Sequence, residues 1–194
     1  VQYNREAVEE VARLMKDLKL NTVCKEANCP NLGECYKKHT ATFMVMGSAC
    51  TRNCRFCNVS CAKPQPLDPD EPRHLAEVAK KLALRHVVVT QVTRDDLPDG
   101  GAAHMAAVVR AVHETCPGTT VEVLISDLKG SEDALRVVLD AKPEVLNHNV
   151  EMVSRLYHDV RPQARYARSL KVLSDSKKFA PNILTKTGFM LGLG

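Results

Sequence analysis

From residue 43 onward, short apolar segments alternate with amphipathic segments, and this alternation limits the fold more than any other feature. The apolar run HVVVTQV at 86–92 is typical of a parallel strand buried on both faces. Pro72 and Ser131 are typical residues of helix starts. The pattern predicts strands at 43–47, 86–92, 121–125, 145–150 and 183–193, and helices at 72–84, 101–115, 131–141 and 164–177. It therefore predicts βαβ units around a parallel sheet.

Two architectures fit this alternation, a doubly wound sheet and part of a (β/α) barrel. Polar and glycine-rich segments follow directly after predicted strands, at 48–57, 93–101 and 147–149. Because barrel enzymes gather their active sites at the C-terminal ends of the strands, this placement favours the barrel. We predict an α/β fold in which residues 43–194 form a partial (β/α) barrel of parallel strands.

Residues 1–42 are predicted to form a separate cysteine-bearing extension that begins with a helix at about 4–18. The sequence does not start with Met, and its last residue directly follows a predicted strand. We therefore expect the chain to be trimmed at its start and truncated at its C-terminus, which leaves the barrel incomplete.

Six of the eight cysteines fall in two triplets near the N-terminus. The first triplet has the spacing C-x4-C-x5-C and the second C-x3-C-x2-C. The members are Cys24, Cys29 and Cys35, followed by Cys50, Cys54 and Cys57. Three thiolates hold three irons of a 4Fe–4S cluster and leave the fourth iron for another ligand, and an open metal position is where chemistry takes place. Two triplets thus indicate two clusters.

Disulfides and zinc are the structural alternatives for these cysteines. Disulfides are disfavoured because the chain is long and its N-terminal segment does not have the pattern of an export signal. Structural zinc commonly uses two CxxC pairs, and this sequence has one, between Cys54 and Cys57. Cys116, alone at the end of a predicted helix, is expected to be a structural thiol.

Cys61 leaves a further alternative open. With Cys54 and Cys57 it forms C-x2-C-x3-C, which is similar to the end of the bacterial ferredoxin pattern. A cluster with four cysteine ligands would have no open iron, and the protein would be an electron carrier. The spacing from Cys50 to Cys54 differs from ferredoxin, and Ala62 replaces the usual proline. We expect Cys61 to be a bystander.

Composition argues against two classes of partner. The net charge is only +4, aromatic residues make up 4% of the chain, and there is no Trp, so nucleic-acid binding has little support. No apolar segment approaches the roughly 18 residues that a membrane-spanning helix needs. We expect a cytoplasmic protein of a bacterium, with an organelle matrix or stroma as the alternative.

The segment GSACTRNCRFCNVSC (47–61) resembles the signature of the radical S-adenosylmethionine (SAM) superfamily, with the aromatic Phe56 before the last cysteine of the triplet. In that superfamily SAM chelates the fourth iron. TVCKEANCPNLGECYKKHTATFMVMG (22–47) resembles the lipoyl synthase family, where its triplet binds an auxiliary 4Fe–4S cluster. The same family is indicated by RDDLPDGGAAH (94–104), VEVLISDLKG (121–130), NHNVE (147–151), VRPQARYARSLKVL (160–173) and TKTGFMLGLG (185–194).

This resemblance implies a sulfurtransferase that inserts two sulfur atoms, at carbons 6 and 8 of an octanoyl chain on a lysine of a lipoyl carrier domain or protein. It implies SAM cleavage to a 5′-deoxyadenosyl radical at the second triplet and sulfur donation by the auxiliary cluster. An electron donor such as ferredoxin or flavodoxin is also implied. The alternatives are another auxiliary-cluster radical SAM sulfur-inserting enzyme, a non-catalytic iron–sulfur electron carrier, and a zinc-stabilised interaction module.

The family departs from this sequence in one respect. Its auxiliary cluster takes a fourth ligand, a serine, from an Arg-Ser-Ser motif near the C-terminus. This sequence ends before any such motif, and its last serines, Ser174 and Ser176, belong to a charged helical pattern. We expect that these residues do not supply the fourth ligand.

Candidate SAM contacts come first from the loop DLPDGG, which begins at Asp96 and ends at Gly101. Barrels of the superfamily place a loop here against the methionine part of SAM. The N–H groups of Gly100 and Gly101, next to a helix N-terminus, are candidate donors to its carboxylate. The alternative is a plain loop that starts a helix.

Asn147 and Asn149 alternate along a predicted strand and therefore share one face. If that face is the barrel interior, they are candidates to bind the ribose or the amino-acid part of SAM, and the alternative is a satisfied polar core. His148 then points outward and is not expected to be a ligand. Arg161 is a candidate to pair with an acid near SAM, and a solvated arginine is the favoured alternative.

Overall fold

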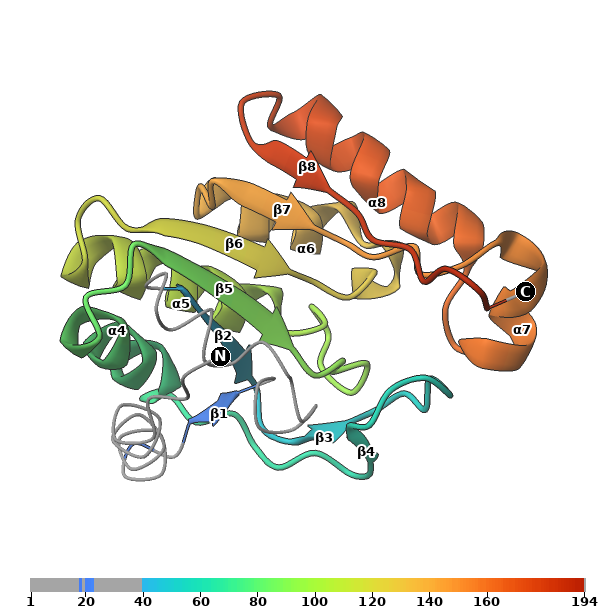
Figure 1. Cartoon of the computed structure of the whole chain (residues 1–194), viewed down its shortest axis with the longest axis horizontal. Coiled ribbons are helices and arrows are strands. Elements are labelled where there is room, and N and C mark those ends of the chain that lie inside the picture. The colour runs from blue at the N-terminus through green and yellow to red at the C-terminus, as the bar shows by residue number, and fades with distance from the viewer. Residues whose placement is uncertain (1–17, 19, 23–39, 194) are drawn as a thin grey trace.

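The computed structural model describes residues 18, 20–22 and 40–193 (Figure 1). The first cysteine triplet and most of the helix predicted at 4–18 lie outside this part. The described residues form a six-stranded sheet in the order β1-β2-β5-β6-β7-β8 and a small ribbon of β3 and β4. The strands of the sheet are β1 (Asn21–Thr22), β2 (Thr40–Val45), β5 (His86–Gln91), β6 (Thr120–Leu124), β7 (Val145–Asn147) and β8 (Leu184–Lys186).

Neighbouring strands of the sheet run parallel from β2 to β8, and β1 pairs antiparallel with β2. A helix connects each successive pair of parallel strands. These helices are α4 (Glu71–Lys81), α5 (Ala102–Thr115), α6 (Glu132–Asp140) and α8 (Tyr166–Phe179). The sequential strand order is that of a barrel, because a doubly wound sheet reverses its order part way. The predicted partial (β/α) barrel is therefore confirmed.

The helices cover one face of the sheet. Val87, Val89 and Leu146 are fully buried on that face, in one core with Leu75 of α4 and Met105 of α5. In Figure 1, α5 and α6 lie behind β5, β6 and β7, with α4 and α8 towards the two ends of the sheet. Residues on the opposite face are mostly half-buried, and this face is the inside of the partial barrel.

The helix starts agree with the sequence. Pro72 lies in the first turn of α4, and Ser131 caps α6 by accepting a hydrogen bond from the N–H of Ala134 at 3.2 Å. Leu75 and Val78 of α4 are buried on the same side, as an amphipathic helix requires.

The structure also differs from the predictions. β7 ends at Asn147 and β8 spans three residues, so the strands predicted at 145–150 and 183–193 are shorter than expected. Glu151 has φ +69°, which regular strand geometry excludes. The ribbon of β3 (Ala49–Cys50) and β4 (Ser60–Cys61), and the short helices η1 (Leu128–Gly130), η2 (Ser154–Leu156) and α7 (Tyr157–Val160), were not predicted.

The division into residues 1–42 and 43–194 stays a prediction, although Asn21 and Thr22 already belong to the sheet through β1. Among the described residues, no helix is long and apolar enough to cross a membrane.

Candidate cluster-binding site

The second cysteine triplet lies at the C-terminal edge of the parallel strands. Cys50 ends β3, and Cys54 and Cys57 lie in the loop that joins β3 to β4. The three side chains line one cavity of about 190 Å³. Its other walls follow β5, β6 and β7, through residues 90–93, 124–126, 148–149, Glu151 and Arg161. This is the edge at which barrel enzymes carry their active sites.

The backbone directs N–H groups at two of the three sulfur atoms. Sγ of Cys50 accepts hydrogen bonds from the N–H of Arg52 at 3.4 Å and from the N–H of Thr93 at 3.3 Å. Sγ of Cys57 accepts one from the N–H of Val59 at 3.5 Å. Such donors stabilise the negative charge of thiolate ligands and tune the potential of iron–sulfur clusters. These backbone N–H groups therefore fit thiolates that bind an iron–sulfur cluster.

The third thiol, Cys54, is half-buried. Burial raises its pKa, and the nearby positive charge of Arg161 partly opposes that rise. A thiol with this surrounding becomes a thiolate ligand once a metal centre supplies positive charge.

The spread of the three cysteines bears on the zinc alternative. In the part of the chain that the structure describes, no three His, Cys, Asp or Glu side chains come close enough to hold a single metal ion. The three thiols instead stand around a shared cavity. A cubane cluster presents separate iron corners to ligands around a cavity, and zinc stays an alternative.

Arg161 provides the positive charge of the cavity. Its side chain is buried, and its Nη1 donates to the carbonyl oxygens of Asn149 at 3.1 Å and Val150 at 3.5 Å. Its Nε is buried without a hydrogen-bond partner among the described residues. The expectation of a solvated arginine is wrong, because the chain after α7 turns this side chain into the cavity. A buried unpaired donor beside a cavity suits an anionic ligand group.

Glu151 supplies an acceptor on the same cavity. Burial raises the pKa of its carboxyl group, while Arg161 and Asn149 oppose the rise. Its φ of +69° is unusual for a residue with a side chain, and such strain gathers at functional sites. The Glu151 N–H donates to the carbonyl of Gly188 at 2.9 Å, which holds this conformation.

Of the two candidate asparagines, only Asn149 lines the cavity. Asn147 lies on the inner face, as predicted, but its Nδ2 donates to Oε1 of Glu122 at 3.4 Å. Lys186 donates to the same carboxylate oxygen at 2.8 Å. Oδ1 of Asn147 is buried without a hydrogen-bond partner among the described residues, so the role of Asn147, as a SAM contact or as a polar-core residue, stays a prediction.

The DLPDGG loop does not reach this cavity. The Gly100 N–H donates to the carbonyl of Leu97 at 3.2 Å, and the Gly101 N–H donates to Oδ1 of Asp99 at 2.9 Å. Both candidate donors are therefore already used within the loop. Gly101 instead begins α5 with φ +88°, and a Cβ there would collide with Sδ of Met46.

Asp96 pairs with Arg94, whose Nη2 lies 2.8 Å from Oδ2 of Asp96. Hydrogen bonding to Arg94 lowers the pKa of this carboxyl group. Both residues border a separate cavity next to residues 63–66. For Asp96, Gly100 and Gly101 the structure therefore supports the plain helix-start loop.

His148 directly follows β7 and points towards α8, as expected, although it also borders the cavity. Its Nδ1 donates to the carbonyl of Ile125 at 2.9 Å, so its Nε2 accepts from Oγ of Ser169 at 2.9 Å. Burial lowers its pKa, and the ring is neutral. Its role is to join strand and helix beside the cavity.

The two remaining cysteines lie outside the cavity lining. Cys61 is exposed, and the bystander interpretation stays a prediction. Sγ of Cys116 donates to the carbonyl of Ala76 at 3.6 Å, as expected of a structural thiol.

Sequence reasoning missed Glu151 as a cavity residue and misjudged Arg161. A signal for Glu151 was available, because it continues the alternation of Asn147 and Asn149 by two further positions. No comparable signal existed for Arg161, because the turn through α7 that buries it is not encoded in any periodic pattern.

Comparison with known proteins agrees with this fold and site. The model of the radical SAM superfamily matches residues 44–194. The fold is similar to methylornithine synthase (PylB), with TM-score 0.62 and 15% identity, over 80% of this chain and 45% of that one. It is also similar to HydG, a maturase of the FeFe hydrogenase, with TM-score 0.63 and 17% identity, over 98% and 47%. The chain belongs to the radical SAM superfamily.

Within that class, higher identity is found with lipoyl synthases. The chain is 58% identical to the lipoyl synthase of Caldanaerobacter subterraneus subsp. tengcongensis, over 97% of this chain and 66% of that protein. It is 54% identical to the lipoyl synthase of Rubrobacter xylanophilus, over 95% of this chain and 58% of that protein. The chain thus spans less than two thirds of the length of these curated relatives.

Proposed function

We propose that this chain carries out the radical SAM chemistry of a lipoyl synthase, inserting sulfur at carbons 6 and 8 of an octanoyl group held on a carrier lysine. The observation that carries the proposal is the cavity shared by Cys50, Cys54 and Cys57 with a buried, partly unpaired Arg161. The identity with lipoyl synthases supports the particular reaction.

Three thiolates would hold a 4Fe–4S cluster at the mouth of the cavity. When bound, the cluster and SAM supply the one-electron cleavage that releases methionine and a 5′-deoxyadenosyl radical. Nε of Arg161 would donate to the carboxylate of SAM, because it is a buried donor without a partner among the described residues. Asn149 and Glu151 line the same cavity, where Asn149 would donate to or accept from the ribose hydroxyl groups of SAM and the carboxylate of Glu151 would accept from them.

Apolar side chains form part of the cavity lining. Val92, Leu124 and Ile125 line the cavity at the ends of the strands, and Phe56 lines it from the cluster loop. Apolar walls suit a reactive carbon radical, since they reduce side reactions with solvent components.

The other parts of the proposal rest on the sequence. Cys24, Cys29 and Cys35 would hold the auxiliary 4Fe–4S cluster that donates sulfur, and they lie outside the described residues. An octanoylated lipoyl carrier would be the substrate and a ferredoxin or flavodoxin the electron donor. A cytoplasmic location in a bacterium fits these partners.

The first test is anaerobic reconstitution with iron and sulfide, followed by dithionite and SAM. We expect 5′-deoxyadenosine from the wild-type chain and none from Cys54→Ala. SAM cleavage by Cys54→Ala would contradict the assignment of this triplet to the SAM-cleaving cluster. An electron carrier would show reversible reduction without any 5′-deoxyadenosine.

A second test separates the two triplets. Replacement of Cys24, Cys29 and Cys35 by Ala should remove about half of the iron and preserve SAM cleavage, because each triplet holds its own cluster. Unchanged iron content would show that the auxiliary site is absent.

A further inference from the structure

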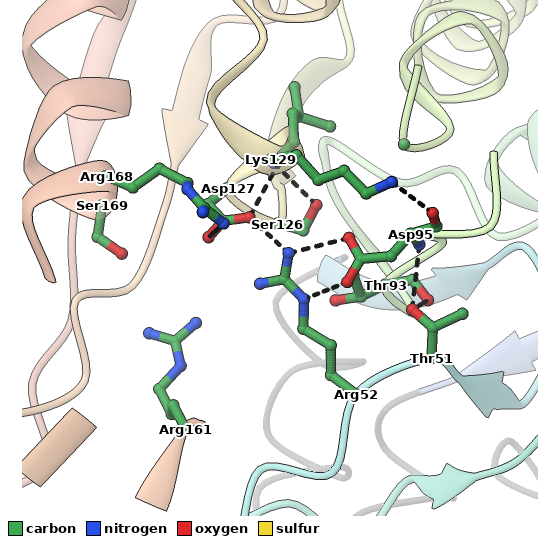
Figure 2. A network of polar contacts seen from close by, with 12 residues as sticks. Thr51, Arg52, Thr93, Asp95, Ser126, Asp127, Lys129, Arg161, Arg168 and Ser169 are labelled. Atoms are coloured by element: carbon green, nitrogen blue, oxygen red, sulfur yellow. Dashed lines mark hydrogen bonds and ion pairs between the residues drawn. The ribbon is translucent and has the colours of Figure 1, made fainter. Parts of the chain in front are cut away.

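Arg52 lies in the cluster loop between Cys50 and Cys54, and its side chain points towards Asp95 and Asp127 (Figure 2). The side chain is only 4% exposed. Its Nε and Nη2 donate to the two carboxylate oxygens of Asp95 at 2.7 and 2.9 Å. Nη2 also donates to Oδ1 of Asp127 at 2.7 Å. Arg52 therefore joins the cluster loop to the segments that follow β5 and β6.

Asp127 is the buried centre of this network, and its side chain has no exposed surface. It also accepts from Nη1 of Arg168 on α8 at 3.2 Å and from the N–H of Lys129 at 3.2 Å. Burial alone would raise the pKa of Asp127, but Arg52 and Arg168 lower it, so the group is ionised. The network thus consists of paired, hydrogen-bonded charges with a fixed geometry.

The backbone beside Arg52 makes a second set of contacts with the same segment. The N–H and Oγ1 of Thr51 both donate to the carbonyl of Thr93, at 3.0 and 2.9 Å. The N–H of Asp95 donates to Oγ1 of Thr51 at 3.0 Å. Residues 51–52 and 93–95 are therefore clamped together by backbone and side-chain bonds, as Figure 2 shows.

These two clamped segments are the ones that donate to the sulfur of Cys50. One N–H comes from Arg52 at 3.4 Å and the other from Thr93 at 3.3 Å. Movement of either segment would lengthen one of these bonds. Arg52 does not line the cavity, so it has no direct contact with a molecule bound there.

A buried ion pair is a poor source of stability, because desolvation of the charges offsets their attraction. The bidentate contact of an arginine with a carboxylate does, however, fix the relative positions of the two side chains. A geometric role at the sulfur of Cys50 explains why a charged residue lies in this position.

We propose that Arg52 is a positioning residue that keeps two N–H donors on the sulfur of Cys50 and thereby makes the cluster of this triplet easier to reduce. The inference rests on the proposed function, since it needs that cluster. N–H groups on a ligand sulfur stabilise the added negative charge of the reduced cluster, so their loss lowers its reduction potential.

The test measures the midpoint potential of the reconstituted protein by anaerobic titration followed by electron paramagnetic resonance, without SAM. Replacement of Cys24, Cys29 and Cys35 by Ala in every sample leaves one cluster to titrate. In Arg52→Gln we expect the equilibrium constant for reduction to fall about tenfold, equivalent to about 59 mV for one electron. Arg52→Lys should lower the midpoint potential by less, because the ammonium group of Lys keeps the positive charge but does not form the bidentate contact of a guanidinium group.

Arg73→Gln is the matched control. Arg73 also pairs with two carboxylates, those of Asp70 and Glu77, but on the exposed surface of α4. This variant should leave the midpoint unchanged. A cluster-free readout is limited trypsin cleavage after Arg55, an exposed residue of the cluster loop, which should be faster in Arg52→Gln than in Arg73→Gln.

Each outcome decides the proposal. An unchanged midpoint in Arg52→Gln at full iron content overturns it, even if the melting temperature falls. If Arg52→Gln does not hold its cluster, the Asp95→Asn variant decides, because it removes the carboxylate that binds Arg52 in bidentate fashion and leaves Arg52 in place. A lowered midpoint potential in Asp95→Asn supports the proposal, and an unchanged midpoint potential overturns it. If the wild-type triplet binds no cluster, the proposed function itself fails, and iron analysis of the wild type identifies that case.

Discussion

Cys61 is the register partner of Cys50 in the parallel pairing of β3 with β4, yet only Cys50 lines the cavity. Cys61 is exposed, whereas two N–H groups bind the sulfur of Cys50. The ribbon therefore places two cysteines next to each other in different surroundings. A cluster with four cysteine ligands needs Cys61 as a ligand, whereas a cluster with an open iron does not.

The first prediction follows from that difference. Cys61→Ala should keep the iron content and SAM cleavage of the wild type. Cys50→Ala should lose SAM cleavage and about half of the iron, because Cys50, unlike Cys61, lines the cavity and each triplet holds its own cluster. Iron analysis and chromatography of 5′-deoxyadenosine check this. Loss of the cluster in Cys61→Ala would favour the electron-carrier alternative instead.

The second prediction concerns Arg161. Arg161→Gln should weaken SAM binding by about 10- to 100-fold, because a hydrogen bond to a charged group contributes about 1.5–3 kcal/mol. Equilibrium dialysis of SAM against the reconstituted protein measures this. Arg155→Gln, a change of an exposed arginine just before α7, is the control and should bind SAM normally. Unaltered affinity in Arg161→Gln would remove Arg161 from the proposed SAM site.

The barrel was predictable because its signals are periodic and local. Val87 and Val89 alternate within an apolar run, and Ser131 precedes an amphipathic segment, so strand and helix could each be read from a few neighbouring residues. The shared position of the cysteine triplet was predictable for a similar reason, since its three cysteines lie within one short segment of the sequence.

The rest of the site depends on contacts between distant segments. Arg52 is buried because Asp95 and Asp127 meet it from two other loops. Gly100 and Gly101 were plausible donors by sequence, but the carboxylate of Asp99 and the carbonyl of Leu97 occupy them. Neither outcome follows from local spacing, because both depend on which polar groups the fold brings together.

The third prediction is a pH dependence from His148. Burial lowers the pKa of this ring from its ordinary value of 6.5. Below about pH 6.5 the unfolded chain binds a proton that the native state does not, so the contribution to stability is fully present above that pH. It is lost as the pH falls towards the native pKa, at up to about 1.4 kcal/mol per pH unit.

Chemical denaturation between pH 5 and pH 8, at equal iron content, measures this contribution. His148→Gln should flatten the dependence in that window relative to the wild type. His158→Gln is the control, because the His158 side chain is 96% exposed and pairs with its neighbour Asp159. Equal slopes for the wild type and His148→Gln would contradict the prediction.

The last prediction uses Gly188, which lies against Asn149. A Cβ at Gly188 would come within 2.9 Å of Oδ1 of Asn149, closer than real contacts allow. The atom in the way is the end of a side chain, so the amide group can move and the fold should persist. Gly188→Ala should therefore weaken SAM binding through displacement of Asn149, with a change in unfolding free energy of about 1 kcal/mol or less.

A double-mutant cycle shows whether the effect passes through Asn149. If it does, Asn149→Ala weakens SAM binding, and addition of Gly188→Ala to that variant has no further effect, because the displaced amide is already absent. Residues in contact are expected to be non-additive in this way, whereas independent sites add. The SAM dissociation constants of the four proteins are the measurement. Additive losses would mean that Gly188 acts by another route, and normal binding by Asn149→Ala would exclude Asn149 from the SAM site.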